Sequence, residues 1–312
     1  MVLDIREIIK ECNEKRDFSP VKNIDITNIT DLSKLFNECE FLWYIDLNIW
    51  SVSHIINMNY MFNSCYRLQS LNISKWDVSK VEDMHCLFCG CFNLENLNIS
   101  KWDVHNVKNM CYMFSYCEHL TTLDISNWDI SNVKDMGNMF MCCDKLKTLD
   151  LSKWDVSNVE NMEDLFTKCY RLENLDISNW NVSKVKNMDS MFCACNSLKT
   201  LDLSKWDVSN VENMGGMFLG SGIKTLNISN WKLTNVKDVY SIFHDCYDLE
   251  LLNLSNWDID DVKRICYKIE ECRNLKTLII LNWDITKIKN NDYKRYILDK
   301  SNVIDTLLFT LN

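Results

Sequence analysis

The sequence predicts an α/β repeat solenoid, because three residue types recur every 26 positions and stay in phase with one another. Such self-similarity is typical of folds in which one small unit stacks on its neighbours. About ten units follow from the tryptophan series, in which a single step is one residue short. The series are tryptophan (Trp50, Trp76, Trp102, Trp128, Trp154, Trp180, Trp206, Trp231, Trp257 and Trp283), phenylalanine (Phe36 to Phe243) and cysteine (Cys39 to Cys272).

One unit combines the hydrophobic periods of a strand and a helix. In the unit that begins at Leu94, Leu97 and Ile99 alternate with polar residues, as in a half-buried strand. Val107, Met110, Phe114 and Cys117 then follow the spacing of one helical stripe. We therefore expect strand, tryptophan-containing turn, short helix and return, with the strands forming a parallel sheet. Capping boxes at Ser79–Glu82, Ser157–Glu160 and Ser209–Glu212 fit helix starts.

The ends of the chain depart from the repeat, so we expect a helical cap at each. The predicted organisation is one continuous structural domain with an N-terminal helical cap over residues 1–35, a solenoid over 36–285 and a C-terminal cap over 286–312. Ile5, Ile8, Ile9 and Cys12 have helical spacing. Residues 293–311 contain one or two helical patterns. We expect them to cover the outward apolar residues Leu251, Ile279 and Leu281, and dimerisation through the same patch is the alternative.

The repeat unit L-D-L-S-K-W-D-V-S-N-V-E-N-M-x-x-M-F resembles the 26-residue repeat of BspA-like leucine-rich-repeat surface proteins over roughly residues 30–290. W-D-V-S-N-V and M-x-x-M-F recur together in phase, which makes the resemblance specific. It implies a leucine-rich-repeat-like solenoid and a role in adhesion or protein binding. The sequence departs from secreted members of that family, because its start does not read as a signal peptide and it carries no wall-anchor or lipidation signal.

Charge and composition narrow the classes of partner and compartment. A net charge of −10 argues against a general affinity for nucleic acid. The sequence contains no run of eighteen apolar residues, so we do not expect membrane insertion. Sixteen cysteines without a signal peptide predict a reducing, cytoplasmic or host-intracellular location, with the cell surface as the alternative. The lysine, asparagine and isoleucine bias fits an AT-rich genome.

The tryptophan and cysteine series are expected to be structural. Stacked indole rings can bury their faces while each N–H reaches a backbone carbonyl. The cysteines occupy the last position of each expected helix, and helices pack about 8–10 Å apart, too far for disulfides. The series should therefore consist of free, buried thiols. We predict no metal site. The one candidate group consists of His85, Cys86, Cys89 and Cys111, but zinc sites ordinarily combine such a motif with a second clear one, and none is present.

The outward strand positions form uniform polar rows with two interpretations. Asp or Asn recurs in one row and Ser in the next, which favours side chains that hydrogen-bond along the sheet; a repetitive ligand is the alternative. Carboxylates about 5 Å apart repel, and Lys147, Lys199, Lys224 or a basic partner could offset this. The carboxylates in question are Asp124, Asp150, Asp176 and Asp202.

Partner specificity is expected where the units differ. The residue after the cysteine of each unit is aromatic at Tyr66, Phe92, Tyr170 and Tyr247, and these side chains are either binding anchors or covers for the edge of the core. The histidines occupy different repeat positions, and no catalytic triad order or phosphate loop occurs. We predict a protein that is not an enzyme, needs no cofactor and binds a protein partner as a scaffold. The alternatives are a surface adhesin and a metal or redox protein that uses the Cys86 group.

Overall fold

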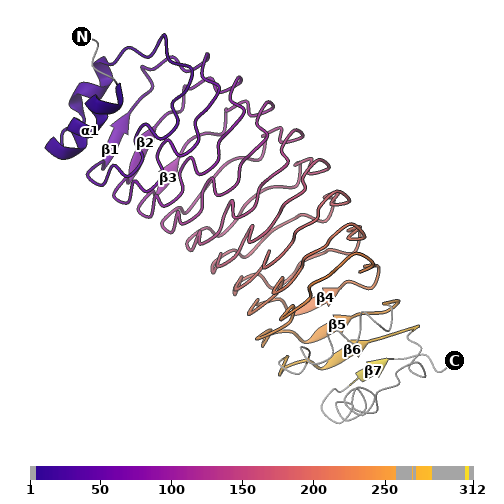
Figure 1. The fold of residues 1–312 in the computed structure, drawn as a ribbon. Helices are drawn as coiled ribbons and strands as arrows, with labels where there is room; N and C mark the ends of the chain where they lie inside the picture. Colours follow the sequence, from indigo (N-terminus) through magenta and orange to yellow (C-terminus); the bar gives the residue numbers. More distant parts are fainter. Residues whose placement is uncertain (1–4, 258–268, 270–271, 283–305, 309–312) are drawn as a thin grey trace.

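Coils stack along one axis in the computed structural model, which describes residues 5–257, 269, 272–282 and 306–308 (Figure 1). Helix α1 (Ile5–Lys15) and the short 3-10 helix η1 (Ser19–Asn23) lie at the N-terminal end. The helix expected there is therefore present, and its Ile9 and Cys12 are buried in the common core. None of the helices in the described part of the chain combines the length and the apolar character that crossing a bilayer requires.

Parallel strands pair along the array, as the sequence predicted, in one sheet of three strands and one of four. Three strands pair in the order β1 (Tyr44–Asp46), β2 (Ser70–Asn72) and β3 (Asn96–Leu97), and four pair in the order β4 (Thr225–Asn227), β5 (Leu251–Asn253), β6 (Thr277–Ile279) and β7 (Thr306–Leu308). Single parallel bridges such as Thr148↔Asn174 lie between them. The register aligns equivalent residues of successive units, for example Leu71 with Leu97.

The short helix predicted in each unit is wrong. Residues 58–65 and their equivalents in the other coils, here called the turn spine, form overlapping β-turns, with Tyr60 and Ser64 at φ 56° and 58°. The amide of Phe62 donates to the carbonyl of Leu87 in the next coil at 3.0 Å, so the coils lie as close here as in the sheet. Helices would need about 8–10 Å between axes. A run of β-turns buries residues at the same spacing as a helix does, which is why the hydrophobic pattern indicated a helix.

The predicted capping boxes are also absent. The amide of Ser79 donates to Asp77 Oδ1 at 3.1 Å in a side-chain turn, and Glu82 pairs with Lys108 in the next coil. A second line of parallel bridges, from Asp31↔Asn57 to Asn213↔Asp238, joins the coils just before the turn spine. Each unit is therefore held to its neighbour at several places around the coil and not by the sheet alone.

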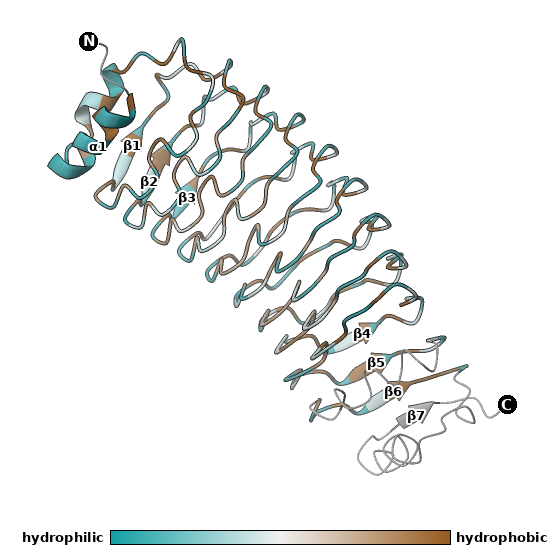
Figure 2. Ribbon diagram, viewed as in Figure 1, coloured by the Kyte–Doolittle hydropathy of each residue, from teal (hydrophilic) through white to brown (hydrophobic). Residues whose placement is uncertain are grey.

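The aromatic core confirms the structural interpretation of the tryptophans. Trp76 and Trp102 stack with ring centroids 6.4 Å apart and 4° between planes, and the same contact recurs along the array. The indole N–H of Trp76 donates to the carbonyl of Leu47 at 2.9 Å. The phenylalanines form a parallel stack beside them, with Phe114 and Phe140 5.8 Å apart. Figure 2 shows hydrophobic and hydrophilic residues alternating along the coils, because each coil turns one set of side chains toward this core.

The described cysteines are free, as predicted, but for a different reason from the one expected. The coils are at hydrogen-bonding distance, so neighbouring cysteines are not held apart by helix packing. Instead the thiol of Cys65 donates to the carbonyl of Phe36 at 3.1 Å, and Cys91, Cys117, Cys143, Cys169 and Cys195 repeat this bond one coil further on each time. Each of these six sulfurs is thus directed at a backbone oxygen of the preceding coil.

The helical conformation predicted for Leu307 and Leu308 is wrong, whereas the C-terminal cap itself stays a prediction. Leu307 and Leu308 were expected in a helical segment but lie in β7, which pairs in parallel with β6 and matches Ile279 with Leu308. Leu251, Ile279 and Leu281 are half-buried. The rest of the expected segment, residues 293–305 and 309–311, lies outside the described residues.

Candidate functional site

The outward carboxylates Asp124, Asp150, Asp176 and Asp202 lie in register on the exposed face of the sheet. Serine hydroxyls donate to three of them within the same coil: Ser126 to Asp124 at 2.9 Å, Ser152 to Asp150 at 2.7 Å and Ser178 to Asp176 at 2.8 Å. The polar rows thus do form hydrogen bonds, but mostly inside a coil. Asn72, whose amide donates to Asp46 at 3.0 Å, is an exception between coils.

Two of these carboxylates, Asp150 and Asp202, are held in the charged form by their serines. Hydrogen bonds from the side chain and amide of Ser152 lower the pKa of Asp150, and those from Ser204 lower the pKa of Asp202. Two of the lysines expected to offset the row pair elsewhere, Lys199 with Asp248 at 2.7 Å and Lys224 with Glu250 at 3.6 Å. Asp124 and Asp150 line one shallow hollow of this face and Asp176 and Asp202 line another, so the exposed negative charge is suited chemically to a basic partner.

The four aromatic residues that follow the cysteines lie in different surroundings. Tyr66 and Phe92 stack with ring centroids 5.4 Å apart, and Tyr116 meets the edge of Phe92 at 6.2 Å. Tyr170 is 39% exposed. Tyr247 lies under the guanidinium of Arg273, 5.2 Å from its ring centroid, and its hydroxyl donates to Asp245. Only Tyr66 and Phe92 are therefore brought together.

An aromatic cluster that the sequence prediction missed lies beside η1 and β1. Phe41, Trp43 and Tyr44 precede or begin the first strand, and Trp43 and Tyr44 are 50% and 59% exposed. The guanidinium of Arg16 lies 4.2 Å from the Phe41 ring centroid, and that of Arg67 lies 5.2 Å from the centroid of Trp43. We call these five residues the N-terminal aromatic patch.

The N-terminal aromatic patch borders a groove of about 450 Å³ that runs between the end of α1 and β1. Lys22, Arg16 and Asp17 line its other side. No carboxylate of the described residues lies within ion-pairing distance of the guanidinium of Arg16 or Arg67. Trp43 was detectable in the sequence, because it is the one tryptophan out of phase with the repeat.

The group considered for metal binding is partly assembled on the turn spine. His85 Nε2 lies 2.9 Å from the hydroxyl of Tyr60 and 3.4 Å from Cys86 Sγ. Interaction with Cys86 lowers the pKa of the Cys89 thiol, whereas burial raises the pKa of the Cys111 thiol to about 12. Across the described residues, no group of three His, Cys, Asp or Glu side chains could hold a metal ion.

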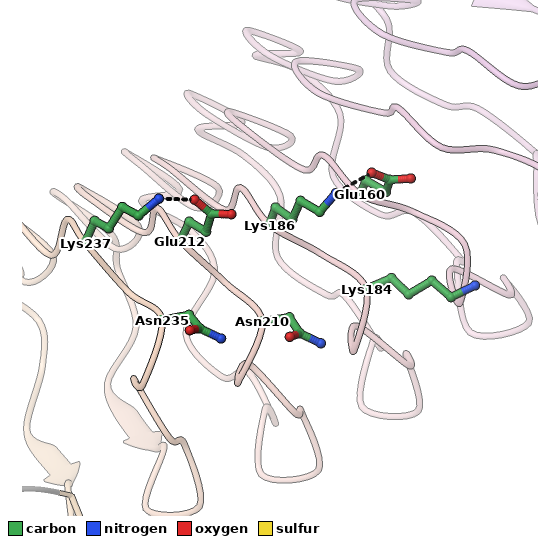
Figure 3. Close-up of a pocket in the computed structure, with 7 residues that line it drawn as sticks. All are labelled: Glu160, Lys184, Lys186, Asn210, Glu212, Asn235 and Lys237. Carbon is green, nitrogen blue, oxygen red and sulfur yellow. Dashed lines mark hydrogen bonds and ion pairs between the residues drawn. The ribbon is translucent and has the colours of Figure 1, made fainter.

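A charged hollow on the side of the array is filled by bonds between coils (Figure 3). Glu160 pairs with Lys186 at 2.8 Å and Glu212 pairs with Lys237, so these four charges alternate along the row. The remaining lysine, Lys184, donates to the side-chain oxygen of Asn158 at 2.6 Å. The amides of Asn210 and Asn235 donate to carbonyls of the preceding coils at 2.7 Å. These exposed pairs contribute little each and leave no convergent polar group for a ligand.

Comparison with known families gives a match over nearly the whole chain. The model of the family described as "Mycoplasma protein of unknown function, DUF285" matches residues 3–123, 63–169, 117–223, 141–251 and 194–302. No curated protein matches the sequence.

Solved structures of repeat proteins are similar at low identity. An internalin from Listeria monocytogenes is 15% identical, with 99% of this chain and 96% of that chain covered and a TM-score of 0.31. A leucine-rich-repeat protein from Bacteroides ovatus is 14% identical, with 89% and 86% covered and a TM-score of 0.32. The functional domain of InlJ from Listeria monocytogenes, which includes a cysteine ladder, is 14% identical, with 87% and 62% covered and a TM-score of 0.26.

Proposed function

The chain belongs to the DUF285 family, and we propose that it is a non-enzymatic scaffold that binds another protein through its N-terminal aromatic patch. The observation that carries this proposal is the exposure of Trp43 and Tyr44 next to two stacked guanidinium groups. The indoles of the described tryptophans in the repeat are at most 5% exposed, whereas Trp43 is 50% exposed. Tryptophan, tyrosine and arginine are the residues that contribute most to protein interfaces.

The charge of the patch favours a partner segment with carboxylate side chains. Each guanidinium keeps its planar donor groups available while its face rests on an aromatic ring, so it can bind a carboxylate in a bidentate geometry. Arg16 and Lys22 line the groove together with the carboxylates of Asp17 and Asp46, and Arg67 lies beside it over Trp43. The rest of the molecule is acidic, with a net charge of −10, and would repel such a segment elsewhere. Tyr66 and Phe92 extend the aromatic surface along the neighbouring coils.

The test is binding to peptide arrays in which glutamate- and aspartate-containing aromatic peptides are paired with their glutamine and asparagine counterparts. We expect binding to depend on the carboxylates, to weaken at least tenfold in Trp43→Ala and Arg67→Ala, and to persist in Tyr170→Ala. A tenfold loss corresponds to about 1.4 kcal/mol, the lower range for an interface anchor. Equal binding by Trp43→Ala and wild type, or by the neutral peptides, would contradict the proposal.

The acidic row is the alternative binding surface, because four exposed carboxylates in register suit a basic partner. The quadruple change of Asp124, Asp150, Asp176 and Asp202 to Asn separates the two surfaces. It should leave binding at the N-terminal aromatic patch intact, and loss of binding in that variant with retention in Trp43→Ala would assign the partner to the sheet face.

A second candidate function is adhesion at a cell surface, which the resemblance to BspA-like repeats favours. We propose the cytoplasmic or host-intracellular location instead, because the buried cysteines act as thiols that donate to backbone carbonyls. Labelling of intact cells with a membrane-impermeant amine reagent distinguishes the two. The scaffold in a cytoplasm should be labelled only after lysis, whereas an adhesin should be labelled on intact cells.

A further inference from the structure

We propose that Cys86 and Cys89 form a redox-active dithiol on the turn spine, which a peroxide oxidises to an intramolecular disulfide. This site is separate from the N-terminal aromatic patch, and its test does not depend on the identity of a binding partner.

The local backbone places the two thiols together. The amide of Cys89 donates to the carbonyl of Cys86 at 3.2 Å, which closes a β-turn from residue 86 to residue 89. The Cα atoms at the two ends of a β-turn lie less than about 7 Å apart, and disulfides need about 4.4–6.8 Å. Cys89 is half-buried, so a small oxidant reaches it, whereas the cysteines that donate to phenylalanine carbonyls are buried.

The chain contains its own control four coils further on. Cys193 occupies the position of Cys89 in that coil and is also half-buried. Its amide donates to the carbonyl of Ser190 at 2.9 Å in the same kind of turn. Ser190 replaces the equivalent of Cys86 and has nearly the same backbone angle, φ 54° against 53°. The two turns therefore differ mainly in whether the first residue is cysteine or serine.

This difference changes the acidity of the second thiol. The hydrogen bond from Cys86 lowers the pKa of Cys89, whereas burial raises the pKa of Cys193 to about 11. The proton stays on Cys86, whose pKa is raised by the same hydrogen bond and by burial. Since the thiolate is the reactive form, Cys89 is the nucleophile of the pair and Cys86 is the resolving thiol.

The oxidation balances with one molecule of peroxide. The Cys89 thiolate attacks one oxygen, the O–O bond breaks, and the departing hydroxide takes up the proton released by Cys89 to give water and a sulfenic acid. The Cys86 sulfur then attacks Cys89 Sγ, the S–O bond breaks, and the hydroxyl group leaves with the Cys86 proton as a second water. The two sulfurs lose two electrons and the peroxide gains them. Cys111 does not compete, because its thiol interacts with Asp135 and burial raises its pKa to about 12.

The first measurement compares alkylation rates in the reduced, folded, full-length protein. At neutral pH we expect Cys89 to react about tenfold faster than Cys193. The larger thiolate fraction of Cys89 is partly offset by the lower nucleophilicity of the more acidic thiol. Trypsin separates the two sites in peptides 81–101 and 187–199. Equal rates would overturn the proposal.

The second measurement treats the same protein with hydrogen peroxide and then blocks the remaining thiols. Peptide 81–101 should lose two hydrogens and carry the block on Cys91 alone. Cys86→Ser should abolish the disulfide and slow Cys89 to the rate of Cys193, and this variant should fold because serine is accommodated at residue 190. The reciprocal change Ser190→Cys should create a disulfide with Cys193. Peroxide that leaves wild-type Cys86 and Cys89 as thiols, or a folded Ser190→Cys protein that forms no disulfide, would refute the geometry argued here.

Discussion

Replacement of Phe140 by alanine tests the stacked core. The side chain is fully buried and stacks on Phe114 at 5.8 Å and Phe166 at 5.7 Å, with Trp154 6.5 Å away. Removing the ring loses about 1.5–3 kcal/mol of apolar burial and about 0.5–1.5 kcal/mol for each of the two stacked pairs. These terms bracket the about 3–5 kcal/mol that Phe→Ala substitutions cost in well-packed cores.

Equilibrium unfolding in urea, followed by circular dichroism, measures the loss. The matched control is Tyr170→Ala, which removes an aromatic ring that is 39% exposed and should change the free energy of unfolding by less than about 0.5 kcal/mol. The backbone of residue 140 should be unaffected, since its carbonyl still accepts the Cys169 thiol and its amide still donates to Leu165.

A loss below about 1 kcal/mol for Phe140→Ala would refute the reasoning, because it would mean that the coils close around the missing ring or that the phenylalanine stack is not the core. A loss in Tyr170→Ala as large as in Phe140→Ala would refute it as well, because the effect would then not depend on burial.

Three further predictions concern the repeat, the turn spine and the C-terminal end. Deletion of residues 141–166 should leave a folded, shorter array with a smaller urea m-value, because coils contact their nearest neighbours; complete loss of structure would contradict this. Burial raises the pKa of Asp164, so the folded protein favours its protonated form, and this stability is lost as pH rises through the folded pKa. Asp164→Asn removes the charge and should therefore stabilise the protein at pH 7. The gain in Asp164→Asn should shrink in acid. Asp150→Asn should lower stability at pH 7, because the lowered pKa of Asp150 means that its charged form stabilises the folded protein at neutral pH. That contribution is lost as pH falls through the folded pKa. Truncation after residue 290 removes β7 and leaves β6 as an open edge, so light scattering should detect self-association; an unchanged monomer of equal melting temperature would contradict this.

The backbone conformation of the turn spine was not predicted from the sequence. Met58, Met61, Phe62 and Cys65 are buried as the pattern required. A helix and a run of β-turns place residues of this spacing on the same side, so the pattern alone does not choose between them. Most of the left-handed residues, such as Tyr60 and Ser64, are neither glycine nor asparagine, and the signal appears only in single coils, at Gly90, Asn138, Gly216 and Gly220. They are held in that conformation by hydrogen bonds to the next coil, which no single unit can make.

The candidate binding surface was predicted in part. Tyr66 and Phe92 were chosen because they break the uniformity of the repeat, and they do stack. Arg16 and Phe41 are separated by an entire α1-to-strand connection, and the sequence gives no reason to pair them. Their contact depends on how α1 and η1 pack against the first coil.

The sequence alone determined the period, the parallel strands and the stacked tryptophans, because each follows from residues that repeat in phase and must bury the same atoms in every coil. The tertiary structure alone decided the backbone of the turn spine, the partners of the thiols and the position of β7. Those features depend on hydrogen bonds between coils, for example Phe62 to Leu87, and such bonds are properties of neighbouring units in contact. A repeating pattern reports which side chains are buried, whereas the path of the backbone is fixed by the carbonyls that the adjacent coil presents.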